Sequence, residues 1–510
     1  MPWQLTWLVG WREALTGLIN EEVAMTEIKQ LDLQPLDGFE AYPRSTVNWD
    51  GCTYYLVQDC ASLEKYLALR GAVAGFDEPV HTIPGGAYYH LNARNAQALR
   101  SRLPWLQPQP GELKTSFGFG DRLGLASPGH ALAAWDAHLY PIFAQQSVRE
   151  NARTGRSPQQ VLDEAMWGIF QLGWGKPWGA DADHLKSPAD IATFVEAGYT
   201  FFTVDPGDYV GSPEKAASLS DLKSAAADLP WADLDSSPEQ TYRNYLDKRF
   251  SLAGFTIEFD EPALLRAMVK YAGAIAHTRR MYQALLALAG AAKFDFEVSV
   301  DETETPTQPA EHFYIASELR RLGIRWVSLA PRFPGRFEKG VDFIGDLDVL
   351  EAELAKHSAI LRHFGGYKLS LHSGSDKFSV YTALAHHAGS LVHVKTAGTS
   401  YLEALRVAAL VEPDFFRQVL DFSRRRYPTD RASYHVSAQE ERVLSGSSLA
   451  DGHLPALLDD FHARQVLHVT YGSVLESFGR HLKTLLVSCE AEYTAGLYKH
   501  FQRHLAPFIS

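Results

Sequence analysis

Eight short apolar segments that each end in a polar turn recur between residues 113 and 410 of this 510-residue chain. Helical runs lie between several of them: "SPQQVLDEAMWGIFQLG" and "SPADIATFVEAG" begin at Ser-Pro pairs typical of a helix start, and "AEHFYIASELRRLG" ends at a glycine. Strands that alternate with helices are typical of βα units around a parallel sheet. Eight such units predict an α/β fold, a (β/α)8 TIM-like barrel rather than an open doubly wound sheet. The predicted strands lie in "TSFGFGDRLGLASPGH", "PIFAQQSVREN", "WGADADHLKS", "YTFFTVDPGDY", "FDFEVSVDETETPT", "IRWVSLAPRF", "YKLSLHSGSDK" and "LVHVKTAGTS".

The remaining residues are assigned around this barrel. Residues 25–112 are predicted to form a small N-terminal region, about 210–290 an insertion after the fourth strand, and 411–510 a helical C-terminal extension. Residues 1–24 begin with a short apolar stretch, but they lack a basic leading segment and are interrupted by charges, so they predict neither a signal peptide nor a membrane span. Because Met25 opens a segment like an ordinary cytoplasmic start, we expect residues 1–24 to be an upstream-start extension; a docked helix is the alternative.

Composition excludes several classes of function. A net charge of -13, without a lysine- or arginine-rich face, argues against a nucleic-acid partner. The three cysteines, Cys52, Cys60 and Cys489, form neither a paired framework nor a C-x-x-C motif, which fits a reducing cytoplasm and leaves His, Asp or Glu as the ligands of any metal. No G-x-G-x-x-G fingerprint, P-loop, G-x-S-x-G or H-E-x-x-H motif is found, so we expect no nucleotide cofactor.

The segment "KLSLHSGSDK" places a polar turn directly after an alternating strand. His372 follows this strand and would lie at the C-terminal mouth of the barrel, where barrel enzymes build their sites. The turn from Ser373 to Lys377 offers backbone amides, hydroxyls, a carboxylate and an ammonium group, including Asp376. We expect it to bind an anionic or hydroxyl-rich ligand. The alternative is that Ser375 or Asp376 caps the next helix.

Two other strand ends carry acidic groups. "DADH" brings Asp183 and His184 close enough for a carboxylate and an imidazole to reach the same space. "EVSVDE" places Glu297, Ser299 and Asp301 on one face of a strand. If this face points into the barrel, Glu297 is a desolvated acid with a raised pKa.

Charged residues also follow the sixth and eighth strands. "APRFPGRFEKGVDF" contributes Arg332, Glu338, Lys339 and Asp342, and Lys395 ends the last strand. A single histidine or charge at a strand end is more often structural than catalytic. The recurrence of such groups at successive strand ends is what indicates a site.

These motifs resemble the tagaturonate epimerases, which interconvert D-tagaturonate and D-fructuronate in bacterial hexuronate catabolism. The resemblance rests on "HSGSDKFSVY", "FGFGDRLGLASPGH", "FAQQSVREN", "WGADADH", "FEVSVDET" and "LAPRF" with "EKGVDFIGD". It implies a divalent metal (Mn, Ni, Co or Zn), no organic cofactor and a keto-uronate substrate. Transferred to the matching positions, it implies a metal bound by His184, His372 and a third ligand in "EKGVD", with Glu338 the first choice and Asp342 the second.

The resemblance also implies an acid–base pair, with Asp183 as proton acceptor and Glu297 as proton donor. Because the inverted carbon is β to the ketone, its C–H bond is not acidified, and either hydride transfer or retro-aldol cleavage and re-addition is required. The absence of a dinucleotide fingerprint favours retro-aldol chemistry. Lys377, Arg332 or Lys395 would bind the substrate carboxylate.

Three other interpretations stay open. A metal-dependent ketose 3-epimerase or sugar isomerase would use the same barrel, metal and acid–base pair. A glycoside hydrolase would need two facing carboxylates and no metal. A non-catalytic uronate-binding protein would bind the same ligand and return it unchanged. The sequence leaves the oligomeric state open, including a homo-oligomer.

Overall fold

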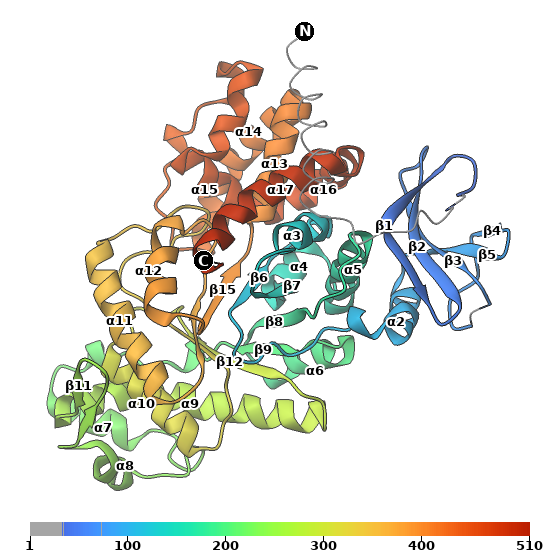
Figure 1. The fold of residues 1–510 in the computed structure, drawn as a ribbon. Coiled ribbons are helices and arrows are strands. Elements are labelled where there is room, and N and C mark those ends of the chain that lie inside the picture. The colour runs from blue at the N-terminus through green and yellow to red at the C-terminus, as the bar shows by residue number, and fades with distance from the viewer. Residues whose placement is uncertain (1–32, 34, 73, 510) are drawn as a thin grey trace.

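The eight predicted strands pair side by side and close a parallel barrel in the computed structural model, which describes residues 33, 35–72 and 74–509. Because every strand is parallel to both neighbours, the eight carboxyl ends lie at one mouth of the barrel (Figure 1). The predicted (β/α)8 barrel is therefore confirmed. Its strands are β6 (Ser116–Phe119), β7 (Tyr140–Ser147), β8 (Gly179–Leu185), β9 (Phe201–Val204), β12 (Asp295–Val300), β13 (Ser328–Pro331), β14 (Lys368–Leu371) and β15 (Val392–Thr396).

Helices follow the strands and cover the barrel. The two predicted Ser-Pro starts are confirmed at α5 and α6: Ser157 Oγ accepts the N–H of Gln160, and the Asp190 carboxylate accepts the N–H of Ser187. Helix α6 ends at Gly198, whose φ of +96° is accessible to glycine at little cost. The covering helices are α3 (Ser127–Ala133), α4 (Val148–Thr154), α5 (Pro158–Gln171), α6 (Pro188–Ala197), α10 (Pro309–Arg321), α11 (Leu347–His363), α12 (Phe378–Ala388) and α13 (Thr399–Val411).

An antiparallel sheet and helix α2 (Ala93–Arg102) precede the barrel. Successive side chains of a strand point to opposite faces, so Tyr54 and Leu56 join the main apolar core while Tyr55 and Val57 form a second, smaller core. The predicted start extension, residues 1–24, falls outside the described residues. The sheet runs in the order β1 (Phe39–Trp49), β2 (Cys52–Asp59), β3 (Lys65–Arg70), β5 (Gly86–His90), β4 (His81–Ile83).

A mostly helical segment separates β9 from β12, where the sequence predicts an insertion. Its long last helix packs against α6 and α10 at the side of the barrel (Figure 1). The segment contains α7 (Leu219–Ala227), α8 (Pro238–Tyr245), the hairpin β10 (Arg249–Ser251) and β11 (Thr256–Glu258), and α9 (Glu261–Ala289).

The C-terminal part is helical, as predicted, and it packs against α3 and α13 next to the barrel mouth (Figure 1). Glu490 of this part accepts hydrogen bonds from Lys65 and Tyr42 of the N-terminal sheet and from Gln171 of α5. One ion-paired network therefore joins the three parts of the chain. The helices are α14 (Pro413–Asp430), α15 (Phe461–Val469), α16 (Tyr471–Ser488) and α17 (Glu490–Leu505).

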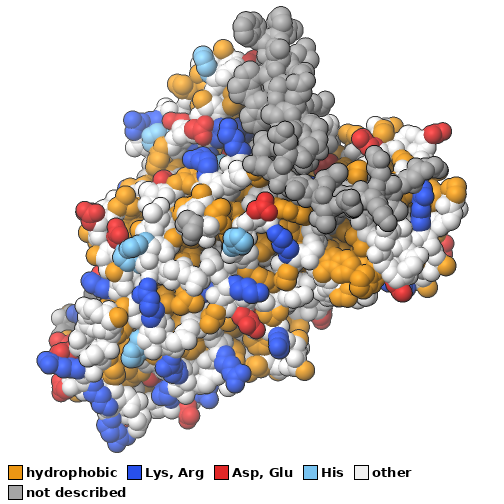
Figure 2. All heavy atoms as spheres, viewed as in Figure 1, with side chains coloured by type: hydrophobic (Ala, Val, Ile, Leu, Met, Phe, Trp, Pro, Cys, Tyr) orange, Lys and Arg blue, Asp and Glu red, His pale blue; other side chains and the backbone are white. Residues whose placement is uncertain are grey.

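The surface carries mixed charge. On the face shown in Figure 2, basic and acidic side chains are interspersed rather than gathered by sign. Among the described residues, no helix combines the length and the apolar character that crossing a membrane requires.

Candidate active site

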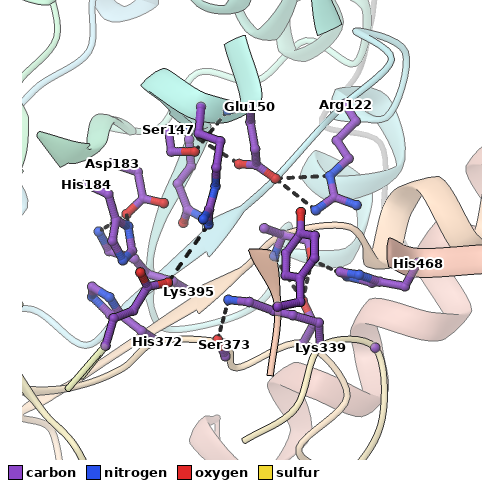
Figure 3. Close-up of a pocket in the computed structure, with 17 residues that line it drawn as sticks. Arg122, Ser147, Glu150, Asp183, His184, Lys339, His372, Ser373, Lys395 and His468 are labelled. Carbon is purple, nitrogen blue, oxygen red and sulfur yellow. Dashed lines mark hydrogen bonds and ion pairs between the residues drawn. The ribbon is translucent and has the colours of Figure 1, made fainter. Parts of the chain in front are cut away.

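Two adjoining cavities open at the carboxyl ends of the barrel strands, the place where barrel enzymes hold their substrates. The smaller has a volume of about 50 Å³ and the larger about 590 Å³. Figure 3 shows the smaller one, with Asp183, His184 and His372 on one side and Arg122 and His468 on the other. The residues that line both cavities are Arg149, Glu302, Lys339, His372, Ser373 and Tyr434.

A bulge at the end of β8 turns two neighbouring side chains into the same space. Ala182 pairs with Phe202 and Leu185 pairs with Val204, so Asp183 and His184 have only one residue of β9 opposite them. His184 adopts a left-handed φ of +53°, which is uncommon for a residue other than glycine. The Nδ1 atom of His184 consequently lies 2.8 Å from Oδ1 of Asp183.

The ligand atoms of Asp183, His184 and His372 all lie within 4.8 Å of one another. Two imidazoles and a carboxylate are donors that suit Zn, Mn, Co or Ni. A second carboxylate adjoins them, since Asp301 Oδ1 lies 3.3 Å from Nδ1 of His372 and 4.0 Å from Nε2 of His184. The donor set therefore fits a divalent cation.

The charges around the two histidines support this fit. Burial opposes the charged imidazolium of His372, but the carboxylates of Asp301 and Glu297 outweigh burial and raise its pKa to about 10. Burial likewise opposes the imidazolium of His184, and the Asp183 carboxylate outweighs it, so the pKa is raised. Positive charge is thus stabilised at this position, and cation binding would displace the imidazole protons.

The structure does not bring the third predicted ligand to this group. The carboxylate of Glu338 accepts hydrogen bonds from the N–H and hydroxyl of Ser437 and from Gln465, at 2.9, 2.7 and 3.1 Å. The carboxylate of Asp342 instead accepts hydrogen bonds at the first turn of α12. The third residue beside His184 and His372 is instead Asp183, to which the resemblance assigned proton transfer.

Glu297 is fully buried on β12 and lines neither cavity. Its Oε1 lies 2.6 Å from Nε2 of His372 and 3.0 Å from Nζ of Lys395, while Oε2 has no partner among the described residues. The predicted rise in its pKa is wrong: burial alone would raise it, but Lys395 and His372 hold the pKa well below its usual range. The strand pattern of β12 could not reveal these two cations, because they come from β15 and from the turn after β14.

Lys395 acts as an internal counterion. Its Nζ lies 2.6 Å from Asp181, 2.8 Å from Asp183 and 3.0 Å from Glu297, and these carboxylates raise its pKa despite burial. With three acidic partners it does not have the free charge that the predicted substrate-binding role requires. Burial is the main cause that raises the pKa of Asp181 to about 7, with Asp183 and Glu297 adding to it and Lys395 opposing it.

Some residues of the turn after β14 face the cavities, and others are buried against the rest of the protein. Ser373 lines both cavities, and its Oγ accepts a hydrogen bond of 2.5 Å from Lys339. Lys377, predicted to bind substrate, is buried and donates to three backbone carbonyls, and it lines neither cavity. The alternative capping role is wrong, because Lys377 holds the N-cap position of α12 and the N–H of Ser379 in the first turn bonds to Asp342 rather than to Ser375 or Asp376. Arg332 lines the larger cavity only.

Asp376 belongs to a second acid–histidine group with His500 and His504, whose ligand atoms also lie within 4.8 Å of one another. Like the first group it is hydrogen-bonded internally: Asp376 accepts from His500 at 2.6 Å and from Arg464 at 2.7 Å, and Nε2 of His504 accepts the N–H of Asp376. This cluster fastens the β14 turn to α15 and α17. It lines neither cavity, so Asp376 is not placed to bind substrate as predicted.

Several cavity residues were not predicted. Arg122 follows the first barrel strand and Ser147 ends the second, both within the quoted motifs, so the strand-end rule, applied to every strand, would have found them. Tyr434 and His468 come from the C-terminal part. No strand-end pattern marks them in the sequence.

A (β/α)8 barrel with a buried acid–histidine group at the ends of its strands defines a barrel enzyme. The chain belongs to the tagaturonate epimerase family, whose model matches residues 42–508. A tagaturonate/fructuronate epimerase from Thermotoga maritima is 44% identical over 474 residues, which cover 92% of this chain and 96% of that protein. The native structure of fructuronate-tagaturonate epimerase UxaE from Cohnella laeviribosi is 36% identical, with a TM-score of 0.87, and 92% of this chain and 97% of that chain are covered. A glycerol complex of the same enzyme gives the same identity and TM-score. The predicted family is confirmed.

Proposed function

We propose that this chain interconverts D-tagaturonate and D-fructuronate with a divalent metal. The observation that carries the proposal is the group of Asp183, His184 and His372 at the barrel mouth, in a chain of the tagaturonate epimerase family. A cation held by these three residues would supply Lewis-acid polarisation of the substrate ketone.

The chemistry of the two keto-acids restricts the route. They differ at a hydroxyl-bearing carbon β to the ketone, so removing a proton from that carbon is not assisted by the carbonyl. Retro-aldol cleavage of the adjacent C–C bond, rotation of the aldehyde and re-addition to its other face inverts the carbon without breaking its C–H bond. This route needs one group that takes the hydroxyl proton during cleavage and returns it after re-addition.

Asp183 is the residue best placed for this proton transfer. Its Oδ1 contacts His184 and Lys395, whereas Oδ2 has no hydrogen bond to another described residue, and the side chain lines the smaller cavity. Burial opposes ionisation, but His184 and Lys395 outweigh it and hold the pKa well below its usual range. Asp183 is therefore ionised, the state that metal binding through one carboxylate oxygen and proton acceptance by the other both require.

Glu297 supports this arrangement from behind the cavity wall. It holds His372 and Lys395 together through one carboxylate oxygen. Because it lines neither cavity, we assign it the positioning of those two groups rather than direct proton donation. The same side chain keeps Lys395 next to Asp183.

We also propose a cytoplasmic location. Its support is that Cys52, Cys60 and Cys489 form no disulfide bond among the described residues, as expected in a reducing compartment.

The proposal is tested by removing metal with a chelator and following D-tagaturonate by NMR before and after adding manganese, nickel, cobalt or zinc. Formation of D-fructuronate that depends on added metal is the expected result. Inversion at the carbon next to the ketone would instead identify a ketose 3-epimerase. No turnover by a folded protein with any of the four metals would refute the assignment.

A further inference from the structure

One lysine of the smaller cavity, Lys339, has no acidic partner among the described residues. Four lysines or arginines line this cavity, and three of them face a carboxylate. The three ion pairs are Arg122 with Glu150 at 2.9 Å, Arg149 with Glu302 at 3.9 Å and Lys395 with Asp183 at 2.8 Å. Lys339 forms no ion pair with any described residue, and its Nζ instead donates to the neutral Oγ of Ser373 at 2.5 Å.

Lys339 and Ser373 lie where the two cavities meet, beside His372 (Figure 3). Since Ser373 Oγ accepts from Lys339, its own proton stays available to a ligand. An ammonium and a hydroxyl at one position form an anion-binding pair. The pair adjoins the group that would hold the metal.

The backbone on both sides of Lys339 is fixed from behind by Lys377. The buried ammonium of Lys377 donates to the carbonyl of Glu338 at 2.9 Å and to the carbonyl of Val341 at 2.5 Å. The loop is thus held while the Lys339 side chain projects into the cavity. This role accounts for a lysine at the turn that is buried and lines neither cavity.

Helix α15 fixes the same loop from the other side. Arg464 donates to the carbonyl of Gly340 at 2.6 Å, and Gln465 donates to the carbonyl of Lys339 at 3.2 Å. Gly340 has a φ of +76°, and a Cβ there would lie 3.0 Å from the side chain of His468, so the close approach of α15 favours glycine. Lys339 is thus a well-positioned cation without a carboxylate partner in the part of the chain that the structure describes, which suits it to bind an external anion.

We infer that Lys339, together with the hydroxyl of Ser373, binds the carboxylate of the substrate and so sets the preference for keto-uronates over neutral ketohexoses. The inference rests on the proposed function for the identity of the substrate. A substrate with its ketone at the acid–histidine group would point its carboxylate along the same cavity, which Lys339 and Ser373 also line. Arg122 is less suited, because Glu150 neutralises it and the ring of Tyr471 stacks on it at 3.6 Å.

The kinetic test compares Lys339→Met and Lys339→Arg with the wild-type enzyme, loaded with the metal that supports turnover. Loss of a charge-assisted hydrogen bond predicts that Lys339→Met raises KM for D-tagaturonate about 10- to 100-fold while kcat changes less. Lys339→Arg is expected to recover most of the affinity. Lys356→Met, which removes an ion pair with Glu353 on α11 away from both cavities, is the matched control and should leave KM unchanged.

Binding without turnover separates this inference from the proposed function. Calorimetry with D-gluconate and with its neutral counterpart D-sorbitol should show that wild type prefers the carboxylate and that Lys339→Met loses the preference. A wild type that prefers D-gluconate but turns over neither keto-acid would refute the function and keep the anion site. The inference is overturned if Lys339→Met keeps KM and D-gluconate affinity within threefold of wild type, or if Arg332→Met causes the loss instead.

Discussion

Lys395 and Asp183 are 212 positions apart in the chain and meet at 2.8 Å inside the barrel mouth. The same ammonium lies 2.6 Å from Asp181 and 3.0 Å from Glu297. One cation from β15 thus balances three buried carboxylates from β8 and β12. Removing a single partner from a buried network is more damaging than replacing several partners together, because it leaves uncompensated charge.

Lys395→Met should therefore both inactivate and destabilise the protein. It leaves three buried carboxylates without their shared cation, so we expect the free energy of unfolding to fall by about 3 to 5 kcal/mol. Urea denaturation measures this loss. The double variant Asp181→Asn with Lys395→Met should recover part of the stability but not the activity; a single variant as stable as wild type would contradict the counterion role.

Metal content distinguishes the two acid–histidine groups. We expect His184→Ala and His372→Ala to lose most bound metal, measured by mass spectrometry after equilibration with manganese or zinc. His500→Gln changes a histidine of the other group and should retain the metal, because that group lines neither cavity.

The third ligand is tested in the same way. Asp183→Asn should weaken metal binding, whereas Glu338→Gln should not, since Glu338 contacts Ser437 and Gln465 instead. If Glu338→Gln reduced the metal content without changing the stability, Glu338 would be a metal ligand, as expected from the sequence.

Sequence patterns predict the barrel because each of its strands is a local signal, an apolar run bounded by a turn. The same reasoning predicts that Asp183, His184 and His372 lie at strand ends. The structure places the three together at the mouth.

The residues whose predicted roles differ from their observed contacts are held by distant parts of the chain, and no local sequence pattern contains such contacts. Lys377 and Asp376 follow the same strand as His372, but their partners come from the loop after β13 and from α15 and α17. Glu338 likewise bonds to Ser437 and Gln465 of the C-terminal part. A single sequence shows which polar groups lie near a strand end. It does not show which of them form hydrogen bonds with distant parts of the chain instead of facing the cavity.

Isotope labelling tests the proposed route. In D2O, the retro-aldol mechanism predicts that D-fructuronate formed from D-tagaturonate carries hydrogen, not deuterium, on the inverted carbon, because that C–H bond is never broken. The adjacent carbon can exchange while the C–C bond is open. NMR of the product reads both positions, and deuterium on the inverted carbon would exclude the route.

The stability of the fold should fall steeply in mild acid. His312 and His357 form a buried pair between α10 and α11, with their Nδ1 atoms 2.7 Å apart. Burial lowers the pKa of His357 to about 3 and holds that of His312 well below 6.5. Below pH 6.5 the unfolded chain binds protons that the folded pair cannot bind, so each histidine removes about 1.4 kcal/mol of stability per pH unit.

His357→Gln should reduce this dependence, because it removes one of the two groups while keeping a side chain that can form hydrogen bonds. We expect the free energy of unfolding, measured in urea between pH 6.5 and 4.5, to fall less steeply than in wild type by about 1.4 kcal/mol per pH unit. His386→Gln on the exposed side of α12 is the control and should follow the wild-type slope. Parallel slopes for wild type and His357→Gln would show that His357 does not contribute to the loss of stability in acid.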